Sequence, residues 1–141
     1  MEFFIKCNPP KTTAQATTRI FKNKYTGKMF IGKTDKAKST REELMALLRP
    51  YVPEKPFSEP LQVVVEWGYP YLKSVRKKDI GKMLPAITRP DADNLLKFLC
   101  DCMTRVGFWV DDSIVWDLRF RKFYTDNAGI WIKIEKFSEK I

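Results

Sequence analysis

The sequence predicts a small α+β domain in which a mixed β-sheet packs against two main helices. Three observations support this class. The 141 residues suffice for one sizeable core but not for two ordinary domains. Apolar segments of strand length occur on both sides of segments with helical signals. No repeat, low-complexity segment or linker-like change in composition interrupts them. We therefore expect a single domain over residues 1–141.

The first third of the chain predicts short elements. Residues 2–7 have the pattern of an opening strand. Residues 12–33 are rich in Thr, Lys and Asn and favour a loose hairpin. A helix is expected over residues 40–48, with Ser39 or Thr40 as its N-terminal cap.

The remaining elements have stronger signals. Residues 61–67 are β-branched and nearly continuously apolar, which makes them the best strand in the chain. A second helix is expected over residues 92–106, because Gly107 suits the left-handed position that ends a helix. Residues 115–124 and 129–137 predict two strands, and the short turn between them favours a hairpin.

The net charge of +9 is unevenly distributed along the chain. Residues 1–90 contain 18 Lys and Arg against 8 Asp and Glu, which gives +10, whereas residues 91–141 contain 8 against 9, which gives −1. The first part suits a surface that binds a polyanion, and the second part gathers acids. A solvated basic face would explain the first part equally well if the acidic part were absent.

The chain has no histidine, and its cysteines are Cys7, Cys100 and Cys102. Mechanisms that need an imidazole base, including the serine and cysteine triads, are excluded. The odd number of cysteines predicts reduced thiols, and a zinc site is not expected, because Cys100 and Cys102 would point to different sides of a helix. No stretch approaches the roughly 20 apolar residues of a membrane span, and the first residues lack a signal-peptide pattern, so a cytoplasmic protein is expected.

Two acidic segments flank the second expected helix. Asp91 follows a proline and suits the N-cap, while Asp93 and Lys97 lie four residues apart on one helical face. Beyond the helix, Asp111 and Asp112 follow a bulky apolar run. A cap, a surface ion pair and a solvated turn would explain each segment alone. The combined pattern is much more specific.

Residues 89–114 resemble the signature of the RusA-type Holliday-junction resolvases. In that family an Asp-x-Asp-Asn-Leu-x-Lys segment opens a helix, an acidic residue follows four positions on, and Gly-Phe-x-x-Asp-Asp comes after it. The length, the basic character and the strong strand before the motif fit the same family. The matching residues are Asp91, Asp93, Asn94, Leu95, Lys97, Asp101, Gly107, Phe108, Asp111 and Asp112.

The resemblance implies a RusA-like fold and a homodimeric DNA-binding endonuclease. Such an enzyme would bind four-way DNA junctions during recombination and repair, and would nick two opposing strands with Mg²⁺ or Mn²⁺. Carried over by position, Asp91, Asp93 and Asp112 would be the essential carboxylates and candidate metal ligands. Lys97 would be a supporting catalytic lysine, and Asp111 is a fourth candidate ligand.

The chemistry of these residues agrees with the resemblance. A hard divalent cation prefers oxygen ligands and keeps several waters, so two or three converging carboxylates suffice to bind it. The ion would offset the repulsion between the carboxylates, activate a water and stabilise charge on the phosphodiester. Lys97, one turn from Asp93, could orient the water or stabilise charge on the phosphate.

Whether the carboxylates meet within one chain or across a dimer depends on residues 107–112. Asp112 can return to Asp93 only if this segment runs back along the helix almost fully extended. We expect this within-chain arrangement, because Phe108 and Val110 could pack one edge of the segment onto the helix. A dimer, with Asp112 supplied by the partner, is the alternative.

The basic stretch of residues 73–82 has no clear period and is expected to form an exposed loop that contacts DNA. Its candidate DNA-binding residues are Lys73, Arg76, Lys77, Lys78 and Lys82. Two other functions stay open. The chain would be a non-catalytic DNA-binding module if the acids were only caps and turn residues. It would be a different metal nuclease if it acted on other branched or single-stranded DNA.

Overall fold

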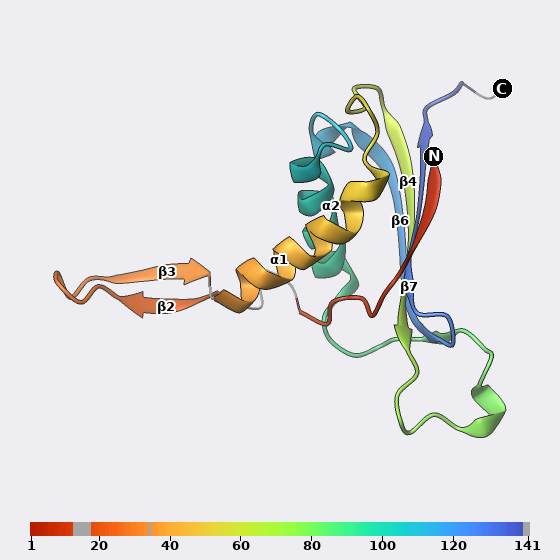
Figure 1. Ribbon diagram of the computed structural model, residues 1–141, viewed down its shortest axis with the longest axis horizontal. Coiled ribbons are helices and arrows are strands. Elements are labelled where there is room, and N and C mark those ends of the chain that lie inside the picture. Colours follow the sequence, from red (N-terminus) through yellow and green to blue (C-terminus); the bar gives the residue numbers. More distant parts are fainter. Residues whose placement is uncertain (13–17, 34, 140–141) are drawn as a thin grey trace.

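A five-stranded mixed sheet covered on one face by two helices forms the body of the protein (Figure 1). The computed structural model describes residues 1–12, 18–33 and 35–139. A separate hairpin, β2 (Thr18–Lys22) with β3 (Met29–Lys33), projects beyond the helical layer. The α+β class with two main helices is therefore confirmed. Residues 13–17 of the expected N-terminal hairpin lie outside the described residues.

The sheet has the order β1-β7-β4-β6-β5. Its strands are β1 (Glu2–Lys6), β4 (Leu61–Pro70), β5 (Leu84–Pro85), β6 (Val115–Thr125) and β7 (Gly129–Lys136). β4 and β6 are parallel, and the other pairs are antiparallel. Parallel neighbours need a crossover connection, and α2 (Ala92–Val106) lies on that connection.

The predicted hairpin between β6 and β7 is wrong. β4 lies between these two strands and pairs with both of them. The physical reason is that β4 is the most continuously apolar strand, so the centre of the sheet buries it best. Gly68 lets the β6–β7 connection cross close to the end of β4, since a Cβ atom there would lie 2.9 Å from Cγ2 of Thr125.

The first helix, α1 (Asp35–Leu48), begins earlier than the sequence suggested. Ser39 and Thr40 lie inside it, so neither is its cap, and Thr40 is buried. Burial of Leu44 and of residues on α2 outweighs the weak helix propensity of these two residues. The helix is followed by the short 3₁₀ turn η1 (Arg49–Tyr51).

The second helix has the predicted bounds and buries one apolar face. Leu95, Leu99 and Met103 are fully buried against the sheet. Gly107 ends the helix at φ 102°, and its N–H donates to the carbonyl oxygen of Met103 at 3.2 Å. Two further 3₁₀ turns, η2 (Lys77–Asp79) and η3 (Asp112–Ile114), lie in the connections on either side of α2. No helix in the described ranges is long and apolar enough to cross a membrane.

Candidate active site

The N-terminus of α2 presents two exposed carboxylates. Asp91 occupies the N-cap position with an extended backbone, as predicted, but its side chain makes no capping hydrogen bond. Asp93 lies in the first turn and is also exposed. Among the described residues, no ion pair joins Asp93 to Lys97, which is exposed one turn further on. A cap and a surface ion pair therefore do not account for these acids, and their oxygens remain available to a ligand.

The segment that leads into Asp91 is fixed by β6. The ammonium group of Lys122 donates to the carbonyl oxygen of Pro90 at 2.7 Å and also to that of Thr88. The hydroxyl groups of Thr88 and Tyr124 lie 3.2 Å apart. Lys122 is a residue that sequence reasoning missed as part of the site. Leu118 and Lys122 lie four positions apart on one strand, so both face the side of the sheet that the helices cover. This alternation is the sequence signal that could have revealed Lys122.

Asp112 lies at the other end of α2. The preceding segment is held beside the C-terminal half of this helix, where the indole nitrogen of Trp109 donates to Oγ1 of Thr104 at 2.7 Å. The backbone N–H of Val110 donates to the carbonyl oxygen of Phe57 at 3.0 Å. Burial, together with the nearby carboxylate of Asp112, raises the pKa of Cys100 to about 12. Asp112 thus lies on the side of the C-terminal half of α2, away from its first turn.

The structure separates the acids that the motif brings together in sequence. Lys122, which binds the residue before Asp91, follows Val115 by seven strand positions, or roughly 23 Å at ~3.3 Å per residue. Asp112 precedes Val115, so Asp91 and Asp112 lie near opposite ends of β6. In the part of the chain that the structure describes, no group of three or more His, Cys, Asp or Glu residues could hold a metal ion.

Within the described residues, the structure does not show the expected return of Asp112 to Asp93. The expectation required residues 107–112 to run back along the helix with Phe108 packed at one edge. Instead, Phe108 and Trp109 are buried in the core at the C-terminal end of α2. Because these two aromatic rings are buried there, too few residues remain between Trp109 and Asp112 to reach back to the start of α2. Asp111, the fourth candidate ligand, is exposed and accepts a hydrogen bond from the hydroxyl of Ser113.

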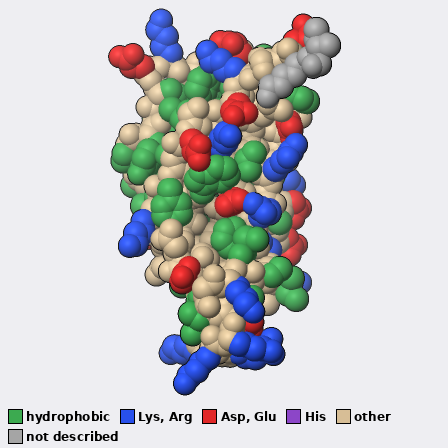
Figure 2. All heavy atoms as spheres, turned by 90° about the vertical axis from the view of Figure 1, so that its right-hand side faces the viewer, with side chains coloured by type: hydrophobic (Ala, Val, Ile, Leu, Met, Phe, Trp, Pro, Cys, Tyr) green, Lys and Arg blue, Asp and Glu red, His purple; other side chains and the backbone are tan. Residues whose placement is uncertain are grey.

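The connection from β4 to α2, residues 71–90, forms a cationic projection that we call the basic loop. Figure 2 shows Lys and Arg side chains gathered at the lower end of the molecule, which this loop forms in Figure 1. All five predicted DNA-binding side chains are exposed: Lys73, Arg76, Lys77, Lys78 and Lys82. Arg76 and Lys82 contact Asp79 at 3.0 and 3.8 Å. No ion pair within the described ranges involves the other three.

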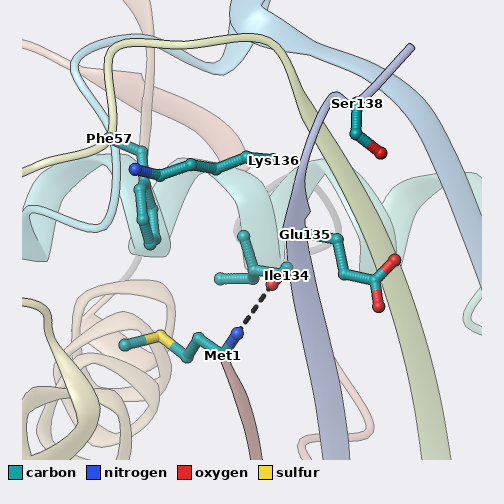
Figure 3. Close-up of a pocket in the computed structure, with 6 residues that line it drawn as sticks. All are labelled: Met1, Phe57, Ile134, Glu135, Lys136 and Ser138. Carbon is teal, nitrogen blue, oxygen red and sulfur yellow. Dashed lines mark hydrogen bonds between the residues drawn. The ribbon is translucent and has the colours of Figure 1, made fainter. Parts of the chain in front are cut away.

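A cavity of about 480 Å³ lies beside the C-terminal end of β7 (Figure 3). The N-terminal ammonium of Met1 donates to the carbonyl oxygen of Ile134 at 2.9 Å on its wall. Lys136 lies 5.9 Å from the centre of the Phe57 ring. None of the predicted catalytic or metal-binding residues lines this cavity.

Comparison with known proteins decides between the classes of function. The model of the family described as "Endodeoxyribonuclease RusA" matches residues 9–135. The chain belongs to the RusA endodeoxyribonuclease family. Members of this family are hydrolases that act on DNA, and they generally need a divalent metal ion. The alternative of a non-catalytic DNA-binding module is thereby disfavoured.

Two relatives of this RusA-family chain differ in how much of it they match. An uncharacterized protein, YqaN of Bacillus subtilis (strain 168), is 28% identical over 118 residues, which are 79% of this chain and 82% of the relative. The crossover junction endodeoxyribonuclease RusA of Escherichia coli O139:H28 (strain E24377A / ETEC) is 41% identical over 46 residues. That alignment covers 33% of this chain and 38% of the relative.

The residues at the start of α2 fit the metal that the family needs. Asp91 and Asp93 offer hard oxygen donors that the described contacts leave without a cationic partner. Two carboxylates with waters are a usual Mg²⁺ ligand set. Cys100 and Cys102 are buried in the core, and burial raises the pKa of both thiols to about 12. The carboxylate pair is therefore of the type that binds a hard divalent cation.

Proposed function

We propose that this chain is a Mg²⁺-dependent endonuclease that resolves four-way DNA junctions by paired phosphodiester hydrolysis. One observation carries the proposal: Asp91 and Asp93 are exposed at the start of α2, next in the chain to a strongly basic loop. Asp91 makes no capping hydrogen bond, and neither acid forms an ion pair with another residue that the structure describes. Two like charges without partners suit a site that binds a cation. The adjacent cations suit the phosphates of the substrate.

Each residue of the motif has a role in this proposal. Asp91 and Asp93 would hold the divalent ion, which supplies charge neutralisation and an activated water when bound. Lys97 lies one turn from Asp93 and would stabilise negative charge on the phosphate. Lys122 donates to the carbonyl oxygens of Thr88 and Pro90 and would therefore act as a positioning residue for Asp91.

Asp112 joins the site only from a second subunit in this proposal. A two-fold axis at the edge of a sheet makes the two edge strands antiparallel. Two copies of β6 related in this way would set the Asp112 end of one strand near the Asp91 end of the other. Support comes from the edge of β6 that faces away from β4. Among the described strands, only β5 pairs with this edge, and it does so only at Phe123 and Tyr124. The exposed side chains of Trp116 and Leu118 near this edge suit burial in a dimer.

Metal dependence is the first test. We expect no cleavage of a four-way junction in excess EDTA and recovery with Mg²⁺ or Mn²⁺, because every proposed ligand is a carboxylate. The measurement is denaturing gel electrophoresis of labelled junction strands, with flap, single-stranded and duplex DNA of the same sequence in parallel. Full activity in the chelator would refute the mechanism. Equal cutting of flaps and junctions would instead favour a general branched-DNA nuclease.

The basic loop should contribute to affinity and not to chemistry. The triple change of Lys73, Lys77 and Lys78 to Ala leaves the Arg76–Asp79 ion pair intact. It should weaken junction binding and reduce the slope of log K against log salt by about one unit for each phosphate that the variant no longer binds. Fluorescence anisotropy at several salt concentrations measures this slope. Lys55→Ala, at the opposite end of the sheet, is the control, and an unchanged slope in the triple variant would show that these lysines are only solvated.

A further inference from the structure

Large aliphatic side chains of the basic loop are exposed among its cations. The side chain of Ile87 is 91% exposed, and those of Ile80, Met83 and Leu72 are 57%, 53% and 48% exposed. Single exposed apolar residues are common on protein surfaces, but several on one projection indicate a binding surface. The metal and phosphate contacts proposed above make no use of them.

The loop holds these side chains on an ordered scaffold. The hydroxyl of Tyr71 accepts a hydrogen bond from the backbone N–H of Gly81 at 2.9 Å. The same hydroxyl lies within hydrogen-bonding distance of the carbonyl oxygens of Lys82 and Asp79, to which it can donate. The carboxylate of Asp79 in turn contacts Arg76 and Lys82. These contacts tie the tip of the loop to its base. Ile87 is held separately, because the backbone N–H of Ala86 before it donates to the carbonyl oxygen of Lys122 on β6 at 3.1 Å. A side chain held on an ordered backbone suits a rigid contact.

The charge of the loop identifies the kind of partner. Residues 71–90 contain six Lys and Arg and one acid, Asp79. Such a surface attracts a polyanion, and aliphatic side chains surrounded by cations suit DNA whose bases are accessible. Ile87 precedes Asp91 by four residues, so the two Cα atoms lie at most about 14 Å apart. A partner that touches Ile87 would therefore also lie close to the proposed site of hydrolysis.

We propose that Ile87 is a wedge that enters the branch point of the DNA and separates stacked bases there. The inference rests on the proposed function and adds how the substrate is opened. Apolar side chains inserted between base steps unstack them at a cost that phosphate contacts can offset. At a branch point the stack is already interrupted, so this cost is smaller than in continuous duplex.

The test uses a junction with 2-aminopurine beside the branch point, because unstacking raises the fluorescence of this base. In EDTA, saturating wild-type protein should raise the fluorescence, and Ile87→Ser should lose most of the rise. Met29→Ser is the matched control, since Met29 is 65% exposed on the separate β2–β3 hairpin. With Mg²⁺, Ile87→Ser should cleave the intact junction about tenfold more slowly. A junction with unpaired bases at the branch should restore its rate.

The outcomes separate the wedge from the proposed function. A full fluorescence rise with Ile87→Ser would overturn the wedge. So would a shift from dimer to monomer on Ile87→Ser in sedimentation, because the aliphatic surface would then belong to a subunit interface. Wild-type protein that cuts junctions without raising fluorescence would refute the wedge alone. Wild-type protein that raises fluorescence and cuts no DNA in Mg²⁺ would refute the proposed function alone.

Discussion

Asp93→Asn should reduce the rate of junction cleavage by at least about a thousandfold while junction binding stays intact or becomes tighter. A divalent ion stabilises the transition state by several kcal/mol, and each 1.36 kcal/mol is tenfold in rate. Asn retains the shape of the side chain but loses the charge that attracts the ion. Removing an acid near DNA also reduces its repulsion from the phosphates. Asp91→Asn should behave in the same way.

The design separates catalysis from folding. Asp91 makes no capping hydrogen bond, and Asn is as favourable as Asp at an N-cap, so its substitution should cost little stability. Asp126→Asn, in the exposed turn between β6 and β7, is the control for a general change of charge. Single-turnover cleavage and a gel-shift assay are measured for each variant. Lost binding by Asp91→Asn or Asp93→Asn would indicate that the acid has a structural role and would remove it from the site.

Local features of the fold could be predicted from the sequence. The bounds of α2, its N-cap at Asp91 and its end at Gly107 follow from short-range rules on caps and helix periodicity. The exposure of the cations in residues 73–82 follows from their lack of period. These features depend on neighbours in sequence, which a single chain displays directly.

Long-range features could not be predicted in the same way. The insertion of β4 between β6 and β7 depends on which strand gains most from burial on both sides, a competition across the whole sheet. The position of Asp112 depends on the burial of Phe108 and Trp109, whose partners come from distant parts of the chain. The family motif places Asp91 and Asp112 in one signature, but the length of β6 sets them apart. Asp91 and Asp112 therefore belong to one sequence motif but lie far apart in the folded chain.

A heterodimer with Asp93→Asn in one subunit and Asp112→Asn in the other should introduce a single nick into a four-way junction. If each site combines Asp91 and Asp93 of one subunit with Asp112 of the other, one of the two sites in this heterodimer retains every carboxylate. If each site were built within one chain, both sites would be broken and no strand would be cut. The strand length of roughly 23 Å from Val115, beside Asp112, to Lys122, beside Asp91, favours the shared site.

The measurement needs two differently tagged chains that are co-expressed and purified through both tags. Each of the two homodimers should be inactive, which shows that a nick by the heterodimer is not due to carry-over of active protein. A heterodimer of wild type with Asp112→Asn is the matched control, and it should also retain one intact site and nick at a similar rate. Failure of the double-variant heterodimer to nick, with that control active, would show that Asp112 acts within its own chain. The segment of residues 107–112 would then have to leave its position beside Phe57 and Thr104 when the enzyme binds DNA.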